Sequence, residues 1–372
     1  MRAPDRRAPP FRADPVGSLL RPATLRQAFK RYGAGELNAP SFREIQDESI
    51  RAAVRGQEDA GLKVVTDGEF RRSSYWARFV ERTEGFEIRT AAYKFRDDSG
   101  HEMQFTTPYA AAKLRRVRAL ALDEFEFLRD VTQVTPKITL PAPSTMHFYA
   151  GRRFADPSVY ADMAQFFADL AQVYRVELAD LAKAGCRYVQ LDEVAIAMLC
   201  DPSVREQAKA EGQNPDRLVD AYVGAINDAV ALRPADMVVG IHVCRGNFKG
   251  HYLAEGGYES VAERFFANAD ATHFLLEYDT RRAGDFAPLR FIPRHKGVVL
   301  GLISTKTPVL ETVDDLKGRI DEASRYADLD RLAIGPQCGF ASTVAGNAIT
   351  EADQQAKLAR MVEVATVVWG SS

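Results

Sequence analysis

The chain has 372 residues, of which 46% are hydrophobic and 27% are charged, a balance typical of a globular protein with a large core. The 49 basic and 51 acidic residues give a formal net charge of -2 and are mixed along the sequence, which argues against nucleic acid as a partner. No stretch approaches the roughly 18 consecutive apolar residues of a membrane-spanning helix, so we expect no membrane contact and a cytoplasmic protein. Four scattered cysteines without a secretory signal disfavour a disulfide framework.

The arginine- and proline-rich residues 1–10 are interpreted as a flexible arm, after which short apolar runs alternate with amphipathic stretches. Eight runs are predicted to be strands: Phe11–Val16, Lys63–Thr66, Thr135–Leu140, Arg187–Leu191, Met237–Val243, His273–Glu277, Val298–Ile303 and Leu332–Ile334. Seven stretches are predicted to be helices: Phe42–Ala60, Leu114–Leu128, Val159–Ala184, Pro215–Leu232, Tyr258–Ala267, Val313–Tyr326 and Glu351–Val368. This alternation predicts an α/β fold, a closed (β/α)8 TIM barrel. No linker divides the chain, so we expect residues 1–372 to form a single catalytic domain.

Residues 86–108 interrupt this alternation. Apolar and polar side chains alternate there around Asp98, Ser99 and Gly100, which predicts a β-hairpin inserted after the second strand. One position for such an insertion is above the mouth of the barrel.

Reactive side chains gather where the predicted strands end, the edge that carries the active site in TIM-barrel enzymes. His242 and Cys244 are two residues apart at the end of the fifth strand, so both side chains point to the same face. Imidazole and thiolate suit zinc, and Glu277 and Cys338 at two other strand ends could complete a four-ligand sphere. The competing interpretation is a buried histidine, structural thiols and a solvated carboxylate.

The motifs at these strand ends together resemble the catalytic C-terminal barrel of the cobalamin-independent methionine synthases. The similarity covers most of the chain and keeps the order and spacing of the family. It rests on Val16-Gly17-Ser18, Asp67-Gly68-Glu69-Phe70, Gln190-Leu191-Asp192-Glu193, His242-Val243-Cys244, Glu277 and Gly335-Pro336-Gln337-Cys338-Gly339-Phe340.

The resemblance implies a metal centre and a substrate site. The implied zinc ligands are His242, Cys244, Glu277 and Cys338. The implied homocysteine site consists of Gly17, Ser18, Glu69 and Asp192. Two carboxylates suit an ammonium group, and amides with a hydroxyl suit a carboxylate, whereas the alternative for the two acids is ordinary salt bridging across the top of the barrel.

The chemistry that follows is methyl transfer to the thiol of homocysteine, giving methionine, from 5-methyltetrahydrofolate or a related donor. A free thiol has a pKa near roughly 8.5, and coordination to zinc removes its proton. A tertiary amine leaves only after protonation, and the candidates for that catalytic acid are Asp192, Glu193 and His147.

The parts of the sequence that would bind the methyl donor depart from the family pattern. The chain is too short to include the N-terminal half of full-length members. The segment Pro141–Tyr149 also lacks the tryptophan that the family places against the pterin, and Val194–Cys200 is apolar. An alternative activity is zinc-dependent alkyl transfer to another thiol, as in an epoxyalkane:coenzyme M transferase. A third possibility is a barrel whose metal cluster is structural or absent.

Overall fold

The computed structural model describes residues 9–97 and 99–372, so most of the predicted arm and Asp98 lie outside the described residues. A parallel sheet of six strands forms its centre, in the order β10-β9-β8-β7-β6-β5. These strands are β5 (Ile138–Pro141), β6 (Tyr188–Glu193), β7 (Val238–Val243), β8 (His273–Glu277), β9 (Gly297–Ile303) and β10 (Leu332–Pro336). Strands that follow one another along the chain are neighbours in the sheet, which is the arrangement of a β/α barrel wall.

The remaining two strand positions lie at the ends of this sheet. The short strand β1 (Val64–Val65) pairs in parallel with β4 (Thr135–Pro136), which leads after one residue into β5. At the other end, Ala13 forms an isolated parallel bridge with Ile334 of β10. Within the described residues no ladder joins residues 11–16 to β1. The fold is therefore α/β with a parallel sheet, and the predicted closed ladder is not present.

The sequence of residues 11–16 accounts for the opening in the ladder. Pro15 has no N–H to donate, and the predicted strand Phe11–Val16 is reduced to a single bridge at Ala13. A buried polar cluster instead holds this segment. The Lys137 ammonium lies 2.6 Å from the Asp14 carboxylate and donates to Gln190 at 3.0 Å, and Asp14 also accepts the Tyr188 hydroxyl.

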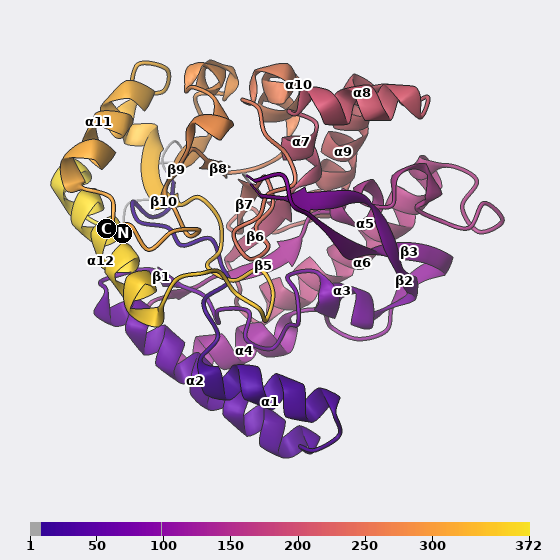
Figure 1. Cartoon of the computed structure of the whole chain (residues 1–372), viewed down its shortest axis with the longest axis horizontal. Helices are drawn as coiled ribbons and strands as arrows, with labels where there is room; N and C mark the ends of the chain where they lie inside the picture. The colour runs from indigo at the N-terminus through magenta and orange to yellow at the C-terminus, as the bar shows by residue number, and fades with distance from the viewer. Residues whose placement is uncertain (1–8, 98) are drawn as a thin grey trace.

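Helices surround the sheet (Figure 1). They are α1 (Ala23–Gly33), α2 (Ala39–Asp59), α3 (Ala77–Glu81), α4 (Leu122–Val131), α5 (Thr145–Phe148), α6 (Met163–Lys183), α7 (Ala195–Met198), α8 (Pro202–Ala210), α9 (Pro215–Val230), α10 (Glu259–Asn268), α11 (Val313–Ala323) and α12 (Glu351–Trp369). Short 3-10 turns are η1 (Gly151–Arg153), η2 (Arg281–Ala283), η3 (Ala287–Phe291) and η4 (Leu329–Arg331). Of the helices in the described part of the chain, none combines the length and apolarity that a bilayer crossing needs.

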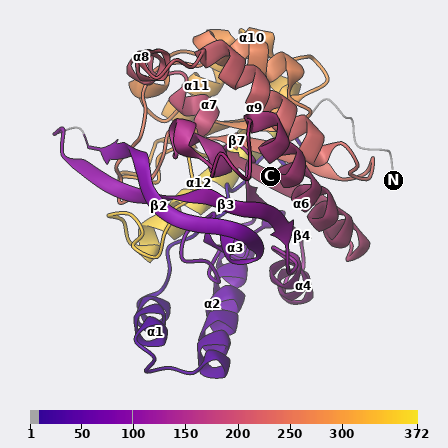
Figure 2. The same ribbon diagram turned by 90° about the vertical axis from the view of Figure 1, so that its right-hand side faces the viewer.

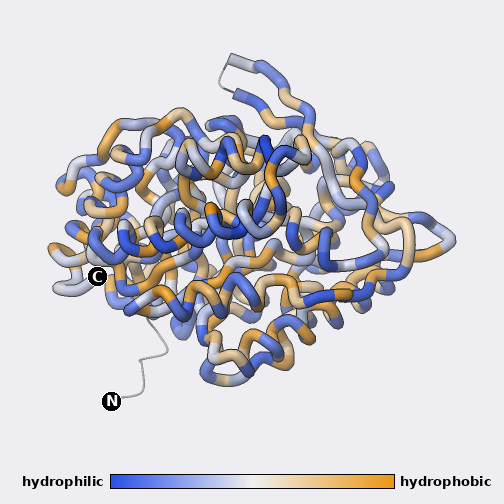
Figure 3. The backbone as a smooth tube through the Cα atoms, turned by 90° about the horizontal axis from the view of Figure 1, so that it is seen from below, coloured by the Kyte–Doolittle hydropathy of each residue, from blue (hydrophilic) through white to orange (hydrophobic). Residues whose placement is uncertain are grey.

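Local sequence signals explain where many of these helices begin. Side chains of the residue before the helix accept backbone N–H groups of the first turn at Asn38, Asp162, Asp201, Asn214, Thr312 and Thr350. Polar and apolar residues alternate along the helical coils in Figure 3, as expected for helices with one face against a sheet. The predicted helix Leu114–Leu128 is wrong in its first half, because β3 continues to Arg116 and α4 begins only at Leu122.

The inserted hairpin is longer than the predicted 86–108. Its antiparallel strands are β2 (Thr83–Arg96) and β3 (Glu102–Arg116), and Figure 2 shows them extending across one side of the molecule. Backbone hydrogen bonds fix both strands to loops beyond the sheet. The Ala92 N–H donates to the Tyr149 carbonyl at 2.7 Å, Arg96 pairs with Tyr252, and the Ala110 N–H donates to the Phe154 carbonyl at 2.9 Å. The hairpin thus lies against loops that follow β5 and β7.

Candidate active site

Three potential metal ligands meet at the carboxyl edge of the sheet. His242 is the penultimate residue of β7, Cys244 follows that strand, and Cys338 follows β10. Their ligand atoms all lie within 4.8 Å of one another, and all three residues are buried. The two thiol sulfurs are 3.1 Å apart. Their hydrogen bond raises the pKa of Cys244 and lowers the pKa of Cys338, so one thiolate is favoured in the group.

The imidazole of His242 is oriented as a metal ligand would be. Its Nδ1 lies 3.2 Å from the Leu275 carbonyl, which fixes the proton on that nitrogen. Its Nε2 is buried and has no hydrogen-bond partner among the described residues. A metal-bound histidine normally donates its other N–H to a carbonyl or carboxylate, and His–Cys–Cys donors suit zinc. The residues present therefore fit a zinc ion.

Glu277 lies at the end of β8, fully buried, but outside that group of three. One carboxylate oxygen accepts the Arg245 backbone N–H at 2.9 Å, and the other lies 3.5 Å from the Lys306 ammonium. Burial alone raises the pKa of Glu277, but Lys306 and Arg245 reverse the effect, and the net pKa is lowered. The carboxylate is thus held ionised beside the metal group, and its role as fourth ligand stays a prediction.

A cavity of about 540 Å³ opens onto the metal group. Ser18, Glu69 and Asp192, three of the predicted substrate residues, line it together with the metal group. Gly17 does not, but its place is constrained, because a Cβ there would lie 2.7 Å from a methyl group of Thr139. The predicted amino-acid site and metal site therefore share one cavity.

The two carboxylates of this cavity are held in different ways. Glu69 has a positive φ of 59°, in a turn where its N–H donates to the Asp67 carboxylate at 2.9 Å. Its Oε1 accepts the Thr139 hydroxyl at 2.8 Å, whereas its Oε2 is buried with no partner in the described chain. Asp192 accepts the Gln190 amide at 2.7 Å, and burial together with Glu69 raises its pKa to about 7.

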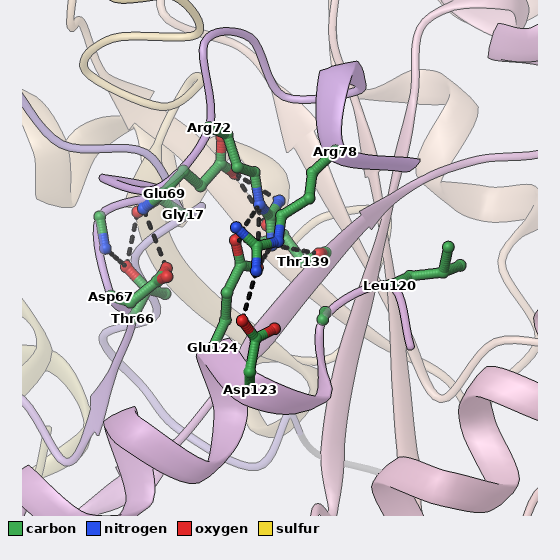
Figure 4. A network of polar contacts seen from close by, with 12 residues as sticks. Gly17, Thr66, Asp67, Glu69, Arg72, Arg78, Leu120, Asp123, Glu124 and Thr139 are labelled. Atoms are coloured by element: carbon green, nitrogen blue, oxygen red, sulfur yellow. Dashed lines mark hydrogen bonds and ion pairs between the residues drawn. The ribbon is translucent and has the colours of Figure 1, made fainter. Parts of the chain in front are cut away.

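A network of arginines holds Glu69 in position (Figure 4). Arg72 donates to the Thr139 hydroxyl at 2.8 Å and to Glu124 at 2.7 Å, and its nearest nitrogen lies 3.7 Å from Glu69. Arg78 also lies 3.3 Å from Glu124. The positive charge of Arg72 is therefore shared with Glu124, and the second oxygen of Glu69 stays buried without a partner in the described chain.

Ser18 lies against Gly339, the residue that follows Cys338. A Cβ at Gly339 would lie 2.0 Å from the Ser18 hydroxyl oxygen, so only glycine permits this contact. Ser18 and Cys338 line the same cavity. The glycine after the cysteine thus has a steric purpose at this position.

Two of the three predicted acids do not reach the cavity within the described chain. Glu193 accepts the Ser144 hydroxyl and, at 2.9 Å, the Ile196 N–H, and burial raises its pKa to about 7. The Nδ1 of His147 is 2.9 Å from the Tyr222 hydroxyl, and burial lowers its pKa to about 3. Only Asp192 of these candidates lines the cavity.

Sequence reasoning missed the aromatic residues of the cavity. The hairpin contributes Phe95 and Phe105, and the loop before α3 contributes Tyr75 and Trp76. The one available signal was the adjacent Tyr75-Trp76 pair, which follows the Asp67-Gly68-Glu69 motif by a few residues. The hairpin residues gave no such signal, because their approach depends on the long-range contacts of the insertion.

The fold and the site together define an α/β protein with a candidate zinc centre at the carboxyl edge of a parallel sheet. The family model of the cobalamin-independent synthase catalytic domain matches residues 12–367. The chain therefore belongs to this family, as the sequence motifs predicted.

Similar proteins span nearly the full chain. It is 40% identical to an uncharacterized Bacillus subtilis protein, YxjH, over 98% of this chain and 96% of that protein. It is 28% identical to a methionine synthase of Pyrococcus abyssi over 87% and 85% of the two chains. A putative vitamin-B12 independent methionine synthase from Listeria monocytogenes has a similar structure, with a TM-score of 0.77, 31% identity and coverage of 98% and 99%.

Proposed function

We propose that this chain is a zinc-dependent methyltransferase that transfers a methyl group to the thiol of homocysteine, forming methionine. The observation that carries the proposal is the shared cavity, which joins the His242, Cys244 and Cys338 group to the carboxylates of Glu69 and Asp192. A thiol bound at the metal group would carry its amino group toward those carboxylates. The similarity to methionine synthases supports the same activity.

The described side chains have distinct parts in this reaction. Zinc, when bound, supplies a Lewis acid that stabilises a thiolate at neutral pH. Glu69 accepts the ammonium of homocysteine with its unpartnered oxygen, and Asp192 faces the same group. The Ser18 hydroxyl donates to the substrate carboxylate. These contacts orient the sulfur, which converts a bimolecular encounter into attack from a fixed position.

The same residues favour homocysteine over the alternative acceptor, coenzyme M. A sulfonate head group would place a negative charge beside the buried oxygen of Glu69, where like charges repel strongly because the surroundings are poorly screened. The donor that the family resemblance implies is 5-methyltetrahydrofolate. In the alternative activity the alkyl donor is an epoxide and the thiol acceptor is coenzyme M.

Cobalt substitution tests the acceptor. We expect Co(II) in place of zinc to show a new thiolate charge-transfer band when homocysteine is added and none with equal coenzyme M. A spectrum unchanged at saturating homocysteine would refute the proposal, and a band with coenzyme M alone would favour the alternative acceptor.

Metal content tests the ligands. We expect Cys338→Ser to lose tightly bound zinc. The matched control is Cys186→Ser, since Cys186 is also buried but contacts the Tyr188 carbonyl instead of the metal group. Equal zinc content in both variants would contradict the ligand assignment.

A further inference from the structure

A band of aromatic side chains borders the same cavity as the metal group. We call this band the aromatic wall, and it consists of Tyr75, Trp76, Phe95, Phe105, Tyr149 and Phe248. Ring centroids are 5.5 Å apart between Phe248 and Phe95, 5.0 Å between Phe95 and Phe105, and 5.1 Å between Phe105 and Tyr149. The hydroxyl oxygens of Tyr149 and Tyr75 are 3.1 Å apart. The hairpin, the residue after α5 and the loops after β1 and β7 thus build one surface.

The lining of the whole cavity is acidic. Three carboxylic acids line the cavity, Glu69, Glu81 and Asp192, and no lysine or arginine of the described residues joins them. A donor with an acidic tail would find no basic side chain along this lining. Aromatic faces attract cations, and a cavity lined by acids concentrates positive ligands. The proposed function assigns Glu69 and Asp192 to the homocysteine ammonium. Aromatic rings alone would accept a flat ring or a cation, and the third acid of the lining, Glu81, favours the cation.

The position of the candidate acids points in the same direction. Glu193 is occupied by Ser144 and the Ile196 N–H, and His147 by Tyr222, both away from the cavity lining. Asp192 lines the cavity, but the proposed function assigns it, together with Glu69, to the homocysteine ammonium. A donor whose leaving group departs as a neutral molecule needs no acid at all, which suits the aromatic wall.

We propose that the methyl donor of this enzyme is a methylsulfonium compound, bound with its cationic sulfur against the aromatic wall and one methyl group toward the metal centre. The inference rests on the proposed function and names its second substrate. The thiolate sulfur of homocysteine forms a bond to the methyl carbon while the bond from that carbon to the sulfonium breaks. The electron pair of the broken bond stays on the leaving sulfur, which departs as a neutral thioether, and no proton is transferred to it.

Donor competition tests the inference directly. The zinc-loaded enzyme is given homocysteine with S-methylmethionine or trimethylsulfonium carrying labelled methyl groups, or with 5-methyltetrahydrofolate. We expect labelled methionine from a sulfonium with kcat/KM at least tenfold above that for the folate. Turnover with the folate alone, or with neither donor while the cobalt band shows homocysteine bound, overturns the donor assignment and leaves the acceptor intact. Absence of the cobalt band counts instead against the proposed function.

Binding to the aromatic wall has a readout that needs no turnover. The chain has two tryptophans, and Trp369 contacts Arg12 and the Leu329 carbonyl outside the cavity. In the Trp369→Leu variant, emission from Trp76 should change on titration with trimethylsulfonium. An unchanged emission, with no protection by the sulfonium against thermal unfolding, overturns the inference.

Variants of the aromatic wall separate a binding role from a structural one. Trp76→Leu should raise the KM for the sulfonium roughly tenfold and leave the homocysteine midpoint of the cobalt band unchanged. Trp369→Leu is the matched control and should change neither value. Phe105→Leu provides a second position should Trp76→Leu fail to fold. Equal sulfonium KM values in a folded wall variant and the control contradict the proposal.

Discussion

Replacement of Glu69 by glutamine removes one negative charge and preserves the size of the side chain. Its Oε1 already accepts the Thr139 hydroxyl at 2.8 Å, a bond that an amide oxygen can keep, and its Oε2 is the buried atom without a partner in the described chain. The lost interaction is therefore a charge-assisted hydrogen bond to the homocysteine ammonium, which contributes about 1.5–3 kcal/mol. We expect Glu69→Gln to weaken homocysteine binding by roughly 10- to 150-fold.

The assay is titration of the Co(II) enzyme, in which the thiolate band reports the dissociation constant. The matched ligand is 4-mercaptobutyrate, which has the thiol and carboxylate of homocysteine but lacks its amino group. Glu69→Gln should bind this analogue as the unmodified enzyme does. An equal loss for both ligands would refute the reasoning, because the variant would then disturb the metal group or the fold instead of an ammonium contact. The control variant is Glu84→Gln, at an exposed hairpin position.

Burial raises the pKa of Glu193 from 4.5 to about 7. Between these values the folded state holds a proton that the unfolded state releases. The free energy of unfolding should therefore fall by about 3 kcal/mol as the pH rises from roughly 4.5 to 7. Glu193→Gln should reduce this dependence of the unfolding free energy on pH, as measured by denaturant titrations of the metal-free protein. An unchanged dependence on pH would contradict the assignment to Glu193. His147→Phe leaves the Tyr222 hydroxyl without its partner and should lower the unfolding free energy by about 1–3 kcal/mol. The pH profile of kcat/KM should not change. Loss of an acidic or basic limb of that profile would instead make His147 a catalytic acid. Lys137→Met leaves Asp14 as a buried unpaired charge and should destabilise by about 3–5 kcal/mol, with partial recovery in the double variant that adds Asp14→Asn. Additive losses in that double variant would show that the two residues do not interact.

The sequence predicted the metal group more securely than the substrate acids. His242 and Cys244 share a face because strand side chains alternate, and the structure brings Cys338 to them. The same alternation places the neighbours Asp192 and Glu193 on opposite faces of β6, so only one of them could line the cavity. His147 lies in a short helix after β5, where strand alternation gives no direction.

Other differences arise from contacts that local patterns do not contain. Apolar residues between Leu114 and Leu128 have helical spacing, but pairing of Arg116 with Thr83 extends the strand. Helix α1 was not predicted, and the residue before it, Pro22, offers no capping side chain. The predicted strand near Ala13 is reduced to one bridge because Pro15 has no N–H to donate, and the buried ion pair of Lys137 and Asp14 holds the segment instead.

With the hairpin present, the proposed acceptor and donor sites are built by separate parts of the chain. In the proposed reaction, residues at the strand ends meet the acceptor, and the hairpin β2–β3 contributes Phe95 and Phe105 to the aromatic wall that faces the donor. Its strands join the loops around Tyr149, Phe154 and Tyr252 through backbone groups, which every residue except proline can supply. If the proposed function holds, exchange of this one insertion between relatives should change the preference for the methyl donor and leave the metal group unaltered, which makes the hairpin a unit for redesign.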